Sequence, residues 1–138
     1  MAKQKILVVD DDEADLDLFK LALSKCNIDV DMNTACNGEE ALENLRGLSD
    51  QKSLPSLVFL DLNMPGKNGR EVLAEMKADA NLKTIPVIVF TSSDYENDVR
   101  QCYDLGCSCY LRKPSSLSDL RALLEATSQF WFEKVIFS

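Results

Sequence analysis

The stretch LVFLDLNMPG, residues 57–66, places an aspartate directly after four apolar residues. The run at 57–60 is typical of a strand that is buried on both faces, and Pro65 with Gly66 marks a turn. Asp61 therefore stands at the end of a buried strand. A carboxylate at the edge of a core costs free energy unless a cation or a hydrogen-bond donor compensates it, so Asp61 is the first candidate for a functional residue.

Similar apolar runs recur along the chain, residues 29–35 alternate in the manner of a more exposed strand, and a stretch with a one-sided apolar pattern follows each of these segments. In residues 13–25, for example, Leu16, Phe19 and Leu23 repeat at helical spacing. We expect strands at 5–9, 29–35, 57–60, 86–90 and 109–111, and helices at 13–25, 37–48, 69–79, 95–106 and 116–130. Solidly apolar strands that alternate with helices predict an α/β fold, a doubly wound parallel sheet with helices on both faces.

Parallel strands end at one edge of the sheet, and ligands of doubly wound folds bind beyond that edge. The residues at the expected strand ends carry carboxylates, a hydroxyl group and a cation: Asp10, Asp11, Asp12, Asp61, Thr91 and Lys113. Neighbouring carboxylates repel one another unless a cation relieves them, and Mg²⁺ prefers carboxylate, water and phosphate oxygens. Lysine and threonine suit the oxygens of a phosphoryl group. The set therefore predicts phosphoryl transfer to Asp61.

Each of these residues has an ordinary structural interpretation when it is taken alone. Asp12 and Asp15 can cap the helix that follows the first strand. Lys113 can be a surface lysine, and Thr91 can be an ordinary residue at a strand end. The functional interpretation depends on their conjunction, since each group stands at the same end of a different strand.

The composition argues against several other classes of protein. The net charge is −8 and no block of Lys or Arg stands out, which argues against nucleic-acid binding. The chain has no histidine, and so no histidine phosphodonor, Ser-His-Asp triad or histidine-ligated metal. No apolar run approaches the roughly 20 residues of a membrane helix, and the start lacks the roughly 7–15 apolar residues of a signal peptide. We expect a cytoplasmic protein without a membrane or nucleic-acid partner.

The five cysteines, Cys26, Cys36, Cys102, Cys107 and Cys109, are odd in number and contain no C-x-x-C pair. Reduced thiols in a cytosolic fold are the expected state. Redox sensing is the alternative interpretation.

Four motifs together resemble the receiver domain of bacterial two-component response regulators. They are ILVVDDD (6–12), LVFLDLNMPGKNG (57–69), VIVFTSSD (87–94) and CYLRKP (109–114), and the similarity spans nearly the whole chain in the same order. The resemblance implies a flavodoxin-like (βα)5 fold with the strand order 2-1-3-4-5. It also implies a phospho-acceptor that promotes its own phosphorylation and dephosphorylation and is not a conventional enzyme.

The resemblance also assigns residues to the predicted phosphoryl and metal sites. Asp61 matches the phospho-acceptor. Asp11 and Asp61 match direct ligands of Mg²⁺, Asp10 a ligand through water, and Asn63 a ligand through its main-chain carbonyl. These roles are implied by position in the family.

Three further positions match the parts of the family that read phosphorylation. Thr91 matches the switch hydroxyl, and Lys113 matches the lysine that pairs with the phosphoryl group. Tyr110 matches the aromatic switch residue that turns inward when the threonine moves. The peptide bond from Lys113 to Pro114 is cis in the family, so a cis bond is expected here.

Three segments are similar to the small single-domain regulators that are paired with bacterial phytochromes: NLKTIPVIVFTSS (81–93), DLGCSCYLRKP (104–114) and ALLEATSQFWFEKVIFS (122–138). This similarity implies a phytochrome-type sensor histidine kinase as the phosphoryl donor, and a homodimer. Ser115 departs from the bulky residue that is common after Lys-Pro in receivers, which leaves the surface that reads phosphorylation in doubt.

The expected function is a single-domain regulator that is phosphorylated on Asp61 and signals to an unknown downstream protein. One alternative is a relay shuttle that passes the phosphoryl group to a histidine phosphotransfer protein, and another is a scaffold that is not phosphorylated. A phosphohydrolase is disfavoured because Asn63 stands where such enzymes carry a second acid, and a flavin module because the first strand ends in aspartates.

Residues 1–129 are expected to form the receiver domain, with no output domain after them. The apolar segment 130–138 has two possible roles. It packs on its own domain, or it forms a seam between two copies of the chain, since an exposed apolar patch usually marks an interface.

Overall fold

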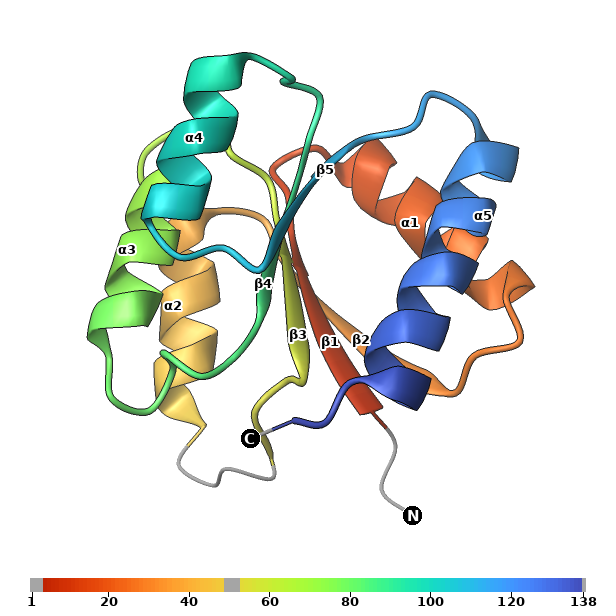
Figure 1. Ribbon diagram of the computed structural model, residues 1–138, viewed down its shortest axis with the longest axis horizontal. Helices are drawn as coiled ribbons and strands as arrows, with labels where there is room; N and C mark the ends of the chain where they lie inside the picture. The colour runs from red at the N-terminus through yellow and green to blue at the C-terminus, as the bar shows by residue number, and fades with distance from the viewer. Residues whose placement is uncertain (1–3, 49–52, 138) are drawn as a thin grey trace.

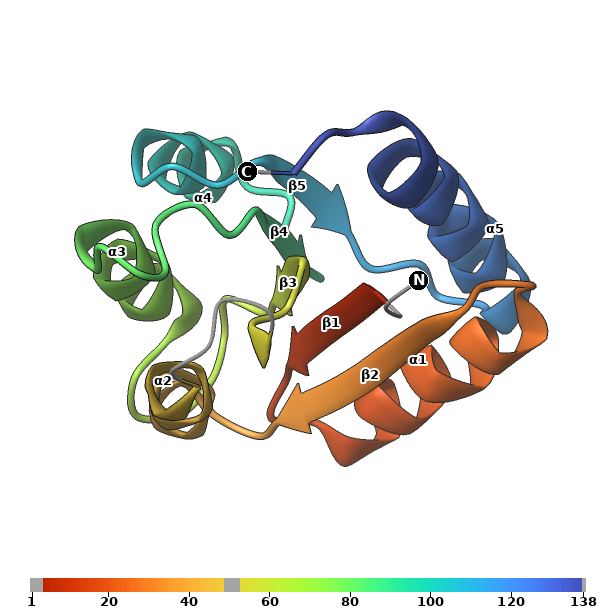
Figure 2. The same cartoon turned by 90° about the horizontal axis from the view of Figure 1, so that it is seen from below.

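The computed structural model describes residues 4–48 and 53–137. Its strands are β1 (Gln4–Val9), β2 (Val30–Ala35), β3 (Leu57–Leu60), β4 (Val87–Thr91) and β5 (Cys109–Arg112), all parallel, in the order β2-β1-β3-β4-β5. Its helices are α1 (Glu13–Lys25), α2 (Gly38–Gly47), α3 (Gly69–Ala78), α4 (Glu96–Asp104) and α5 (Leu117–Ser128). One layer holds α2, α3 and α4, and the other holds α1 and α5 (Figure 1, Figure 2). The predicted flavodoxin-like (βα)5 fold is confirmed.

The boundaries of the elements agree with the predicted ones to within two residues. Asn37 caps α2 by accepting the N–H of Glu40 at 2.8 Å, and Ser116 caps α5 by accepting the N–H of Asp119 at 3.1 Å. The predicted ranges include these two cap residues. The helices themselves begin one residue later, because a cap has extended rather than helical backbone angles. None of the helices in the described ranges has the length and apolar character to cross a membrane.

The apolar residues of the central strands alternate between the two faces of the sheet. One set packs under α2, α3 and α4: Leu7, Val9, Val58, Leu60, Val87 and Val89. The other packs under α1 and α5: Ile6, Val8, Leu57, Phe59, Ile88 and Phe90. Phe19 of α1 makes edge contacts with Phe59 and Phe90 at ring-centroid distances of 5.1 and 5.9 Å. Because both faces are buried, the register of each strand is fixed, and so is the residue at which it ends.

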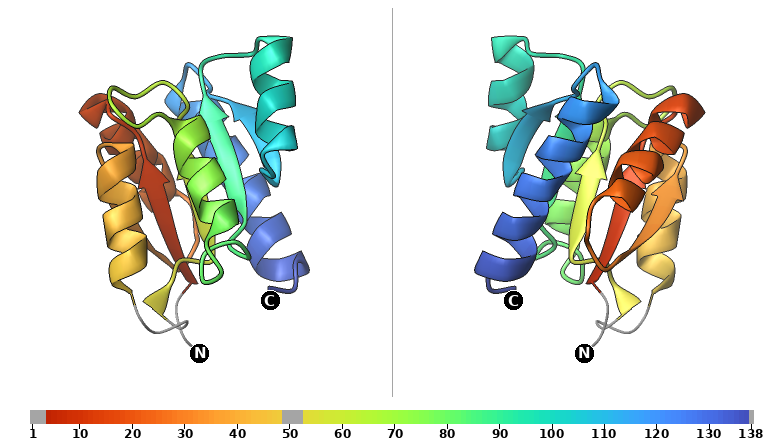
Figure 3. Two further views of the ribbon diagram at one scale, coloured as in Figure 1. Left: turned by 90° about the vertical axis from the view of Figure 1, so that its left-hand side faces the viewer. Right: turned by 90° about the vertical axis from the view of Figure 1, so that its right-hand side faces the viewer.

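The chain continues beyond α5 as a π-helical segment, η2 (Gln129–Lys134), which the sequence did not predict. Trp131, Phe132 and Phe137 pack against the core under α1 and α5, and the rings of Trp131 and Phe137 stack at 6.2 Å. Residues 135–137 lie beside the starts of β3 and β4, at the end of the sheet opposite to the carboxyl ends of the strands (Figure 1, Figure 3). Part of the predicted tail therefore packs on its own domain.

Two apolar side chains of the same segment face the solvent. Phe130 is 57% exposed and Ile136 is 95% exposed. Residue 138, the last of the predicted tail, lies outside the described residues.

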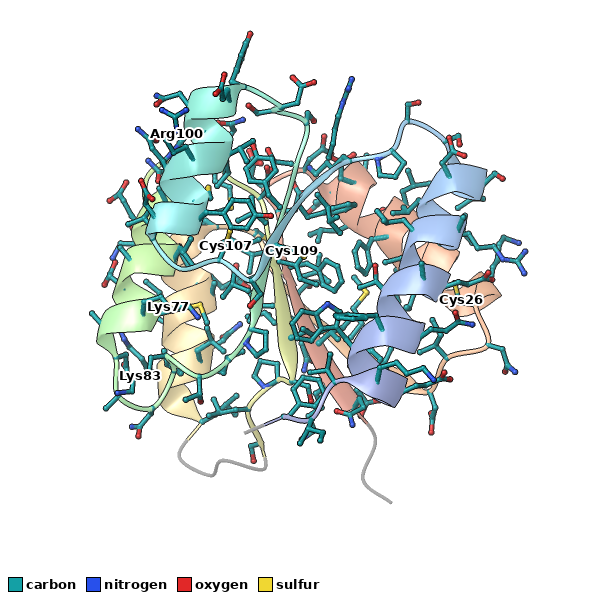
Figure 4. All side chains as sticks on the ribbon, in the orientation of Figure 1. Cys26, Lys77, Lys83, Arg100, Cys107 and Cys109 are labelled. Carbon is teal, nitrogen blue, oxygen red and sulfur yellow. The ribbon has the colours of Figure 1, made fainter. Side chains whose placement is uncertain are left out.

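All five cysteines are free, which is the state that the sequence predicts. In Figure 4, Cys107 and Cys109 lie near β5; Cys107 packs under α2, α3 and α4, whereas Cys109 and Cys26 pack on the other face of the sheet, under α1 and α5. Burial raises the pKa of the Cys107 thiol to about 11. This thiol is therefore protonated at neutral pH, which makes it a weak nucleophile.

Helix α3 begins against the backbone that carries Asp61. The N–H of Gly69 donates to the carbonyl of Leu62 at 3.1 Å. A Cβ atom at Gly69 would lie 2.2 Å from the carbonyl oxygen of Asp61 and 2.8 Å from the Cα of Leu62. Only glycine allows the helix to start this close to the end of β3.

We expect Gly69→Ala to lower the free energy of unfolding by about 1–3 kcal/mol, because the new methyl group forces the end of β3 and α3 apart. Gly47→Ala is the matched control: its Cβ would meet nothing within 4 Å, so stability should stay the same or rise by up to about 1 kcal/mol. Urea denaturation of the two variants measures the difference. Equal effects would show that the close approach at Gly69 does not constrain the fold.

Candidate functional site

The loops that follow β1, β3, β4 and β5 meet at one end of the sheet, the upper end in Figure 1. Asp10 and Asp61 are buried there although they are ionisable, with exposed fractions of 4% and 6%. Their main chains continue the sheet: the N–H of Asp10 donates to Ala35 at 3.1 Å, and that of Asp61 donates to Val9 at 3.0 Å. The sheet therefore sets the position of both carboxylates.

Three carboxylates form a cluster at this edge. Asp10, Asp11 and Asp61 can each offer one oxygen, and these oxygens all lie within 4.8 Å of one another. Asp11 is exposed while the other two are buried, so the cluster is open to solvent on one side. Hard divalent cations take oxygen ligands and often retain water. This donor set fits a divalent metal ion.

Asn63, the predicted main-chain ligand, lies two residues after Asp61 in the exposed part of the loop between β3 and α3. Its neighbours Leu62 and Met64 are buried with exposed fractions of 0% and 7%. These apolar anchors hold the loop against the core while Asn63 faces outward. Its role as a ligand stays a prediction.

Lys113 places a cation beside the three carboxylates. Its Nζ lies 2.6 Å from Oδ2 of Asp10, 2.9 Å from Oδ2 of Asp15 and 3.3 Å from Oδ2 of Asp61. Burial of the side chain opposes its charged form, but the hydrogen bonds to Asp10 and Asp15 and the negative charges nearby outweigh burial and raise the pKa of Lys113. The ammonium group is thus firmly charged and stands beside the Asp61 carboxylate.

The pKa of Asp10 is raised as well, but for a carboxyl group this favours the uncharged form. Burial raises the pKa of its carboxyl group above the ordinary value, and the charge of Asp61 adds to this effect. The hydrogen bonds from Lys113 and from the N–H of Asp12 oppose the increase without cancelling it. A further cation near Asp10 would favour its charged form.

The acidic residues at the start of α1 divide into two roles. Asp12 is the N-cap, because its carboxylate accepts the N–H groups of Ala14 at 2.9 Å and Asp15 at 3.4 Å. Asp15, which the sequence suggested only as a cap, instead contacts Lys113. The available signal was its position three residues after the cap, on the side of the first turn that faces the end of β1.

The hydroxyl of Thr91 is buried and has no hydrogen-bond partner, the only such side-chain atom in the described part of the chain. Thr91 ends β4 with 0% exposure, and its carbonyl accepts the N–H of Lys113 at 2.8 Å. A buried hydroxyl without a partner costs free energy, and such atoms are uncommon away from functional positions. The hydroxyl is therefore available to donate a hydrogen bond to a ligand oxygen.

The loop after Thr91 is held by a polar network that the sequence did not predict. The hydroxyl of Tyr110 donates to the carbonyl of Ser93 at 2.8 Å, and the hydroxyl of Ser93 donates to Asp98 at 2.7 Å. Asp98 in turn pairs with Arg70 of α3. The hydrogen bond from Ser93, together with Arg70, lowers the pKa of Asp98. The network joins α3, α4 and β5 to the loop that follows Thr91.

The expected cis peptide bond is wrong. The described residues contain no cis peptide bond, so Lys113 is joined to Pro114 by a trans bond. The trans form is intrinsically favoured before proline by about 0.5–1 kcal/mol. Lys113 reaches its three carboxylates in this geometry.

Comparison with known proteins gives a consistent result. The family model described as "Response regulator receiver domain" matches residues 6–125. Response regulator Rcp1 of Synechocystis sp. (strain ATCC 27184 / PCC 6803 / Kazusa) is 41% identical over 132 residues, which cover 94% of this chain and 90% of that protein.

Two solved structures are also similar over their full lengths. The phosphorylated cyanobacterial phytochrome response regulator RcpA has a TM-score of 0.89 and 39% identity, with 99% of both chains covered. The Mn²⁺-bound form of response regulator Rcp1 has a TM-score of 0.85 and 39% identity, covering 98% of this chain and 99% of that chain.

The raised pKa of Asp10 makes stability depend on pH. The raised pKa contributes to the free energy of unfolding. This contribution is full below the ordinary pKa of 3.8 and is lost as the pH rises through the raised pKa of the folded state. In chelator, we therefore expect Asp10→Asn to unfold at a higher urea concentration than the wild type at neutral pH. The gap should close as the pH approaches that ordinary value.

Urea denaturation across this pH range, with Asp17→Asn as the control for the loss of one exposed acid, measures the effect. A gap that does not change with pH, or an Asp10→Asn variant less stable at neutral pH, would contradict the prediction.

Proposed function

The chain belongs to the response regulator receiver family of phospho-acceptor signalling proteins, and we propose that it accepts a phosphoryl group on Asp61 from a sensor histidine kinase. The observation that carries the proposal is the buried Asp61 carboxylate beside the Lys113 ammonium group, 3.3 Å away. A buried carboxylate at a strand end, next to a cation and a metal-binding cluster, has the surroundings that phosphoryl transfer needs.

The metal that we assign to the cluster is Mg²⁺. The residues that would hold it are Asp11 and Asp61 through their carboxylates, Asn63 through its main-chain carbonyl, and Asp10 through water. The Mn²⁺-bound form of Rcp1 supports a divalent cation at this position. When bound, Mg²⁺ supplies positive charge that neutralises the oxygens of the transferred group.

The residues of the chain perform the transfer by position and charge. A carboxylate oxygen of Asp61 attacks the phosphorus atom, and an O–P bond forms as the N–P bond to the donor histidine breaks. The nitrogen of the donor keeps the electron pair of that bond. Lys113 stands where it can stabilise the negative charge on the phosphoryl oxygens.

The response to phosphorylation begins at the hydroxyl of Thr91. This hydroxyl is without a partner in the structure, so it can donate to a phosphoryl oxygen without breaking another bond. A shift of Thr91 moves the following loop, in which the Ser93 carbonyl accepts the hydroxyl of Tyr110. The domain then has two conformations, one in which Thr91 contacts the phosphoryl group and one in which it does not. Phosphorylation shifts the population toward the first.

The similarity to Rcp1 and RcpA supports a phytochrome-type kinase as the donor, because RcpA is a phytochrome response regulator. The output is binding to a downstream protein. Use as a relay shuttle rests on the same site chemistry and remains the second candidate. A phosphorylation-independent scaffold would not need the buried cluster of Asp10, Asp61 and Lys113. The cytoplasmic location stays a prediction.

The proposed receiver unit is 1–129, and the segment 130–138 contributes to a homodimer. Phe130 and Ile136 support this role because they leave apolar surface in water next to aromatic residues that are packed. In such a dimer, the two Asp61 sites would be held at a fixed distance and orientation relative to each other.

We expect incubation with acetyl phosphate and Mg²⁺ to add one phosphoryl group to the wild type, and chelator to prevent the addition. Asp61→Asn should abolish it, whereas Asp17→Asn, on the exposed side of α1, should be labelled like the wild type. Intact-mass spectrometry measures the product.

If the wild type gains no mass and also binds no beryllofluoride, the protein is a scaffold. Labelling of Asp61→Asn to the same extent would show that another residue is the acceptor.

We expect the wild type to sediment as a dimer, and the double variant Phe130→Ser with Ile136→Ser to sediment as a monomer with its fold retained. Leu21→Ser is the control, since Leu21 is an apolar side chain of α1 that is 47% exposed. Analytical ultracentrifugation gives the masses. A wild type that is monomeric at high concentration excludes the homodimer.

A further inference from the structure

The three partners of Lys113 are not equivalent. Asp10 and Asp61 belong to the cluster that fits a divalent cation, whereas Asp15 does not. Asp15 comes from the first turn of α1, and its carboxylate is 40% exposed, compared with 6% for Asp10 and 8% for Asp61. Two partners of Lys113, Asp10 and Asp61, would thus also serve a metal ion, whereas Asp15 would serve Lys113 alone.

The ammonium group of Lys113 needs a partner at all times. Its side chain is only 13% exposed, and it has three N–H donors, which face the three carboxylates. A buried charge that loses its partners is strongly destabilising. When Asp10 and Asp61 serve a metal ion, the bond at 2.9 Å to Asp15 is the one that can persist unchanged.

The contact between Asp15 and Lys113 lies beside a small cavity, which is lined by Asp15, Leu18, Lys113 and Pro114 among others. The main chain of Asp15 is fixed, because its N–H donates to the cap residue Asp12. Asp15 therefore reaches Lys113 from a backbone that belongs to the capped start of α1.

We infer that Asp15 is a positioning residue that holds the Lys113 ammonium group in the site and so frees Asp10 and Asp61 to bind the metal ion. This role of Asp15 rests on the proposed function and adds Asp15 to the residues of the phosphoryl and metal site. Without Asp15, Lys113 bonds only to the two carboxylates that the metal ion uses, and it competes with the ion for them.

The test is a titration of the full-length protein with Mg²⁺, followed by amide NMR, in the unphosphorylated state. We expect Asp15→Asn to weaken Mg²⁺ binding about three- to tenfold. Asp17→Asn removes the same charge two residues along α1 and should weaken binding by less than about twofold, because exposed charges are screened. Asp15→Glu keeps the carboxylate and should bind Mg²⁺ more tightly than Asp15→Asn.

The same variants in a Lys113→Ala background show whether Asp15 acts through the lysine. The inference requires the effect of Asp15→Asn to disappear there, because no ammonium group is left to compete. A second measurement follows the ¹⁵N signal of the Lys113 ammonium group. Mg²⁺ should broaden this signal by exchange with water in Asp15→Asn and leave it sharp in the wild type.

Three outcomes overturn the inference: equal effects of Asp15→Asn and Asp17→Asn, an effect of Asp15→Asn that survives in full without Lys113, or an ammonium signal that responds alike in both proteins. These outcomes are distinct from a failure of the proposed function, in which the wild type itself neither binds Mg²⁺ nor accepts a phosphoryl group on Asp61.

Discussion

Burial of the sheet on both faces is the constraint on which the rest of the molecule depends. Alternate residues of β1, β3 and β4 face opposite helical layers, so a slip in register would expose one of the two apolar sets to water. Parallel strands that cannot slip end at a common edge. Polar groups that would be costly along the strands are tolerated at this edge, and the side chains of Asp10, Asp61 and Thr91 gather there.

The carboxyl edge of the sheet is dominated by charged side chains. Lys113 offsets part of the negative charge of Asp10, Asp15 and Asp61, and the exposed Asp11 adds another acid. Burial, with a smaller contribution from the charge of Asp61, nevertheless raises the pKa of Asp10. The site therefore carries an excess of negative charge that favours the binding of a cation.

The fold and the grouping of the strand-end residues could be predicted because both follow from local patterns. Solid apolar runs fix the strands, and the residue after each run is then at the common edge. The contact between Lys113 and Asp15 joins residues 98 positions apart, and that between Arg70 and Asp98 joins α3 to α4. Such contacts depend on how two helices or loops pack side by side, which no periodicity records. The continuation of α5 into η2 was missed, although no glycine or proline ends the helix between Ser128 and Lys134.

The structure of α4 has a mechanical consequence. The helix buries a single residue, Cys102, and its first turn has no side-chain cap, whereas α3 buries Gly69, Val72, Leu73 and Met76 and begins in a capping box. Its attachment to α3 and to the loop after Thr91 is polar, through Asp98 with Arg70 and Ser93. Water can replace such contacts at much lower cost than it can enter an apolar core. α4 is thus the helix of its layer with the weakest apolar attachment, and its contacts with the rest of the layer can be broken at lower cost than those of α3.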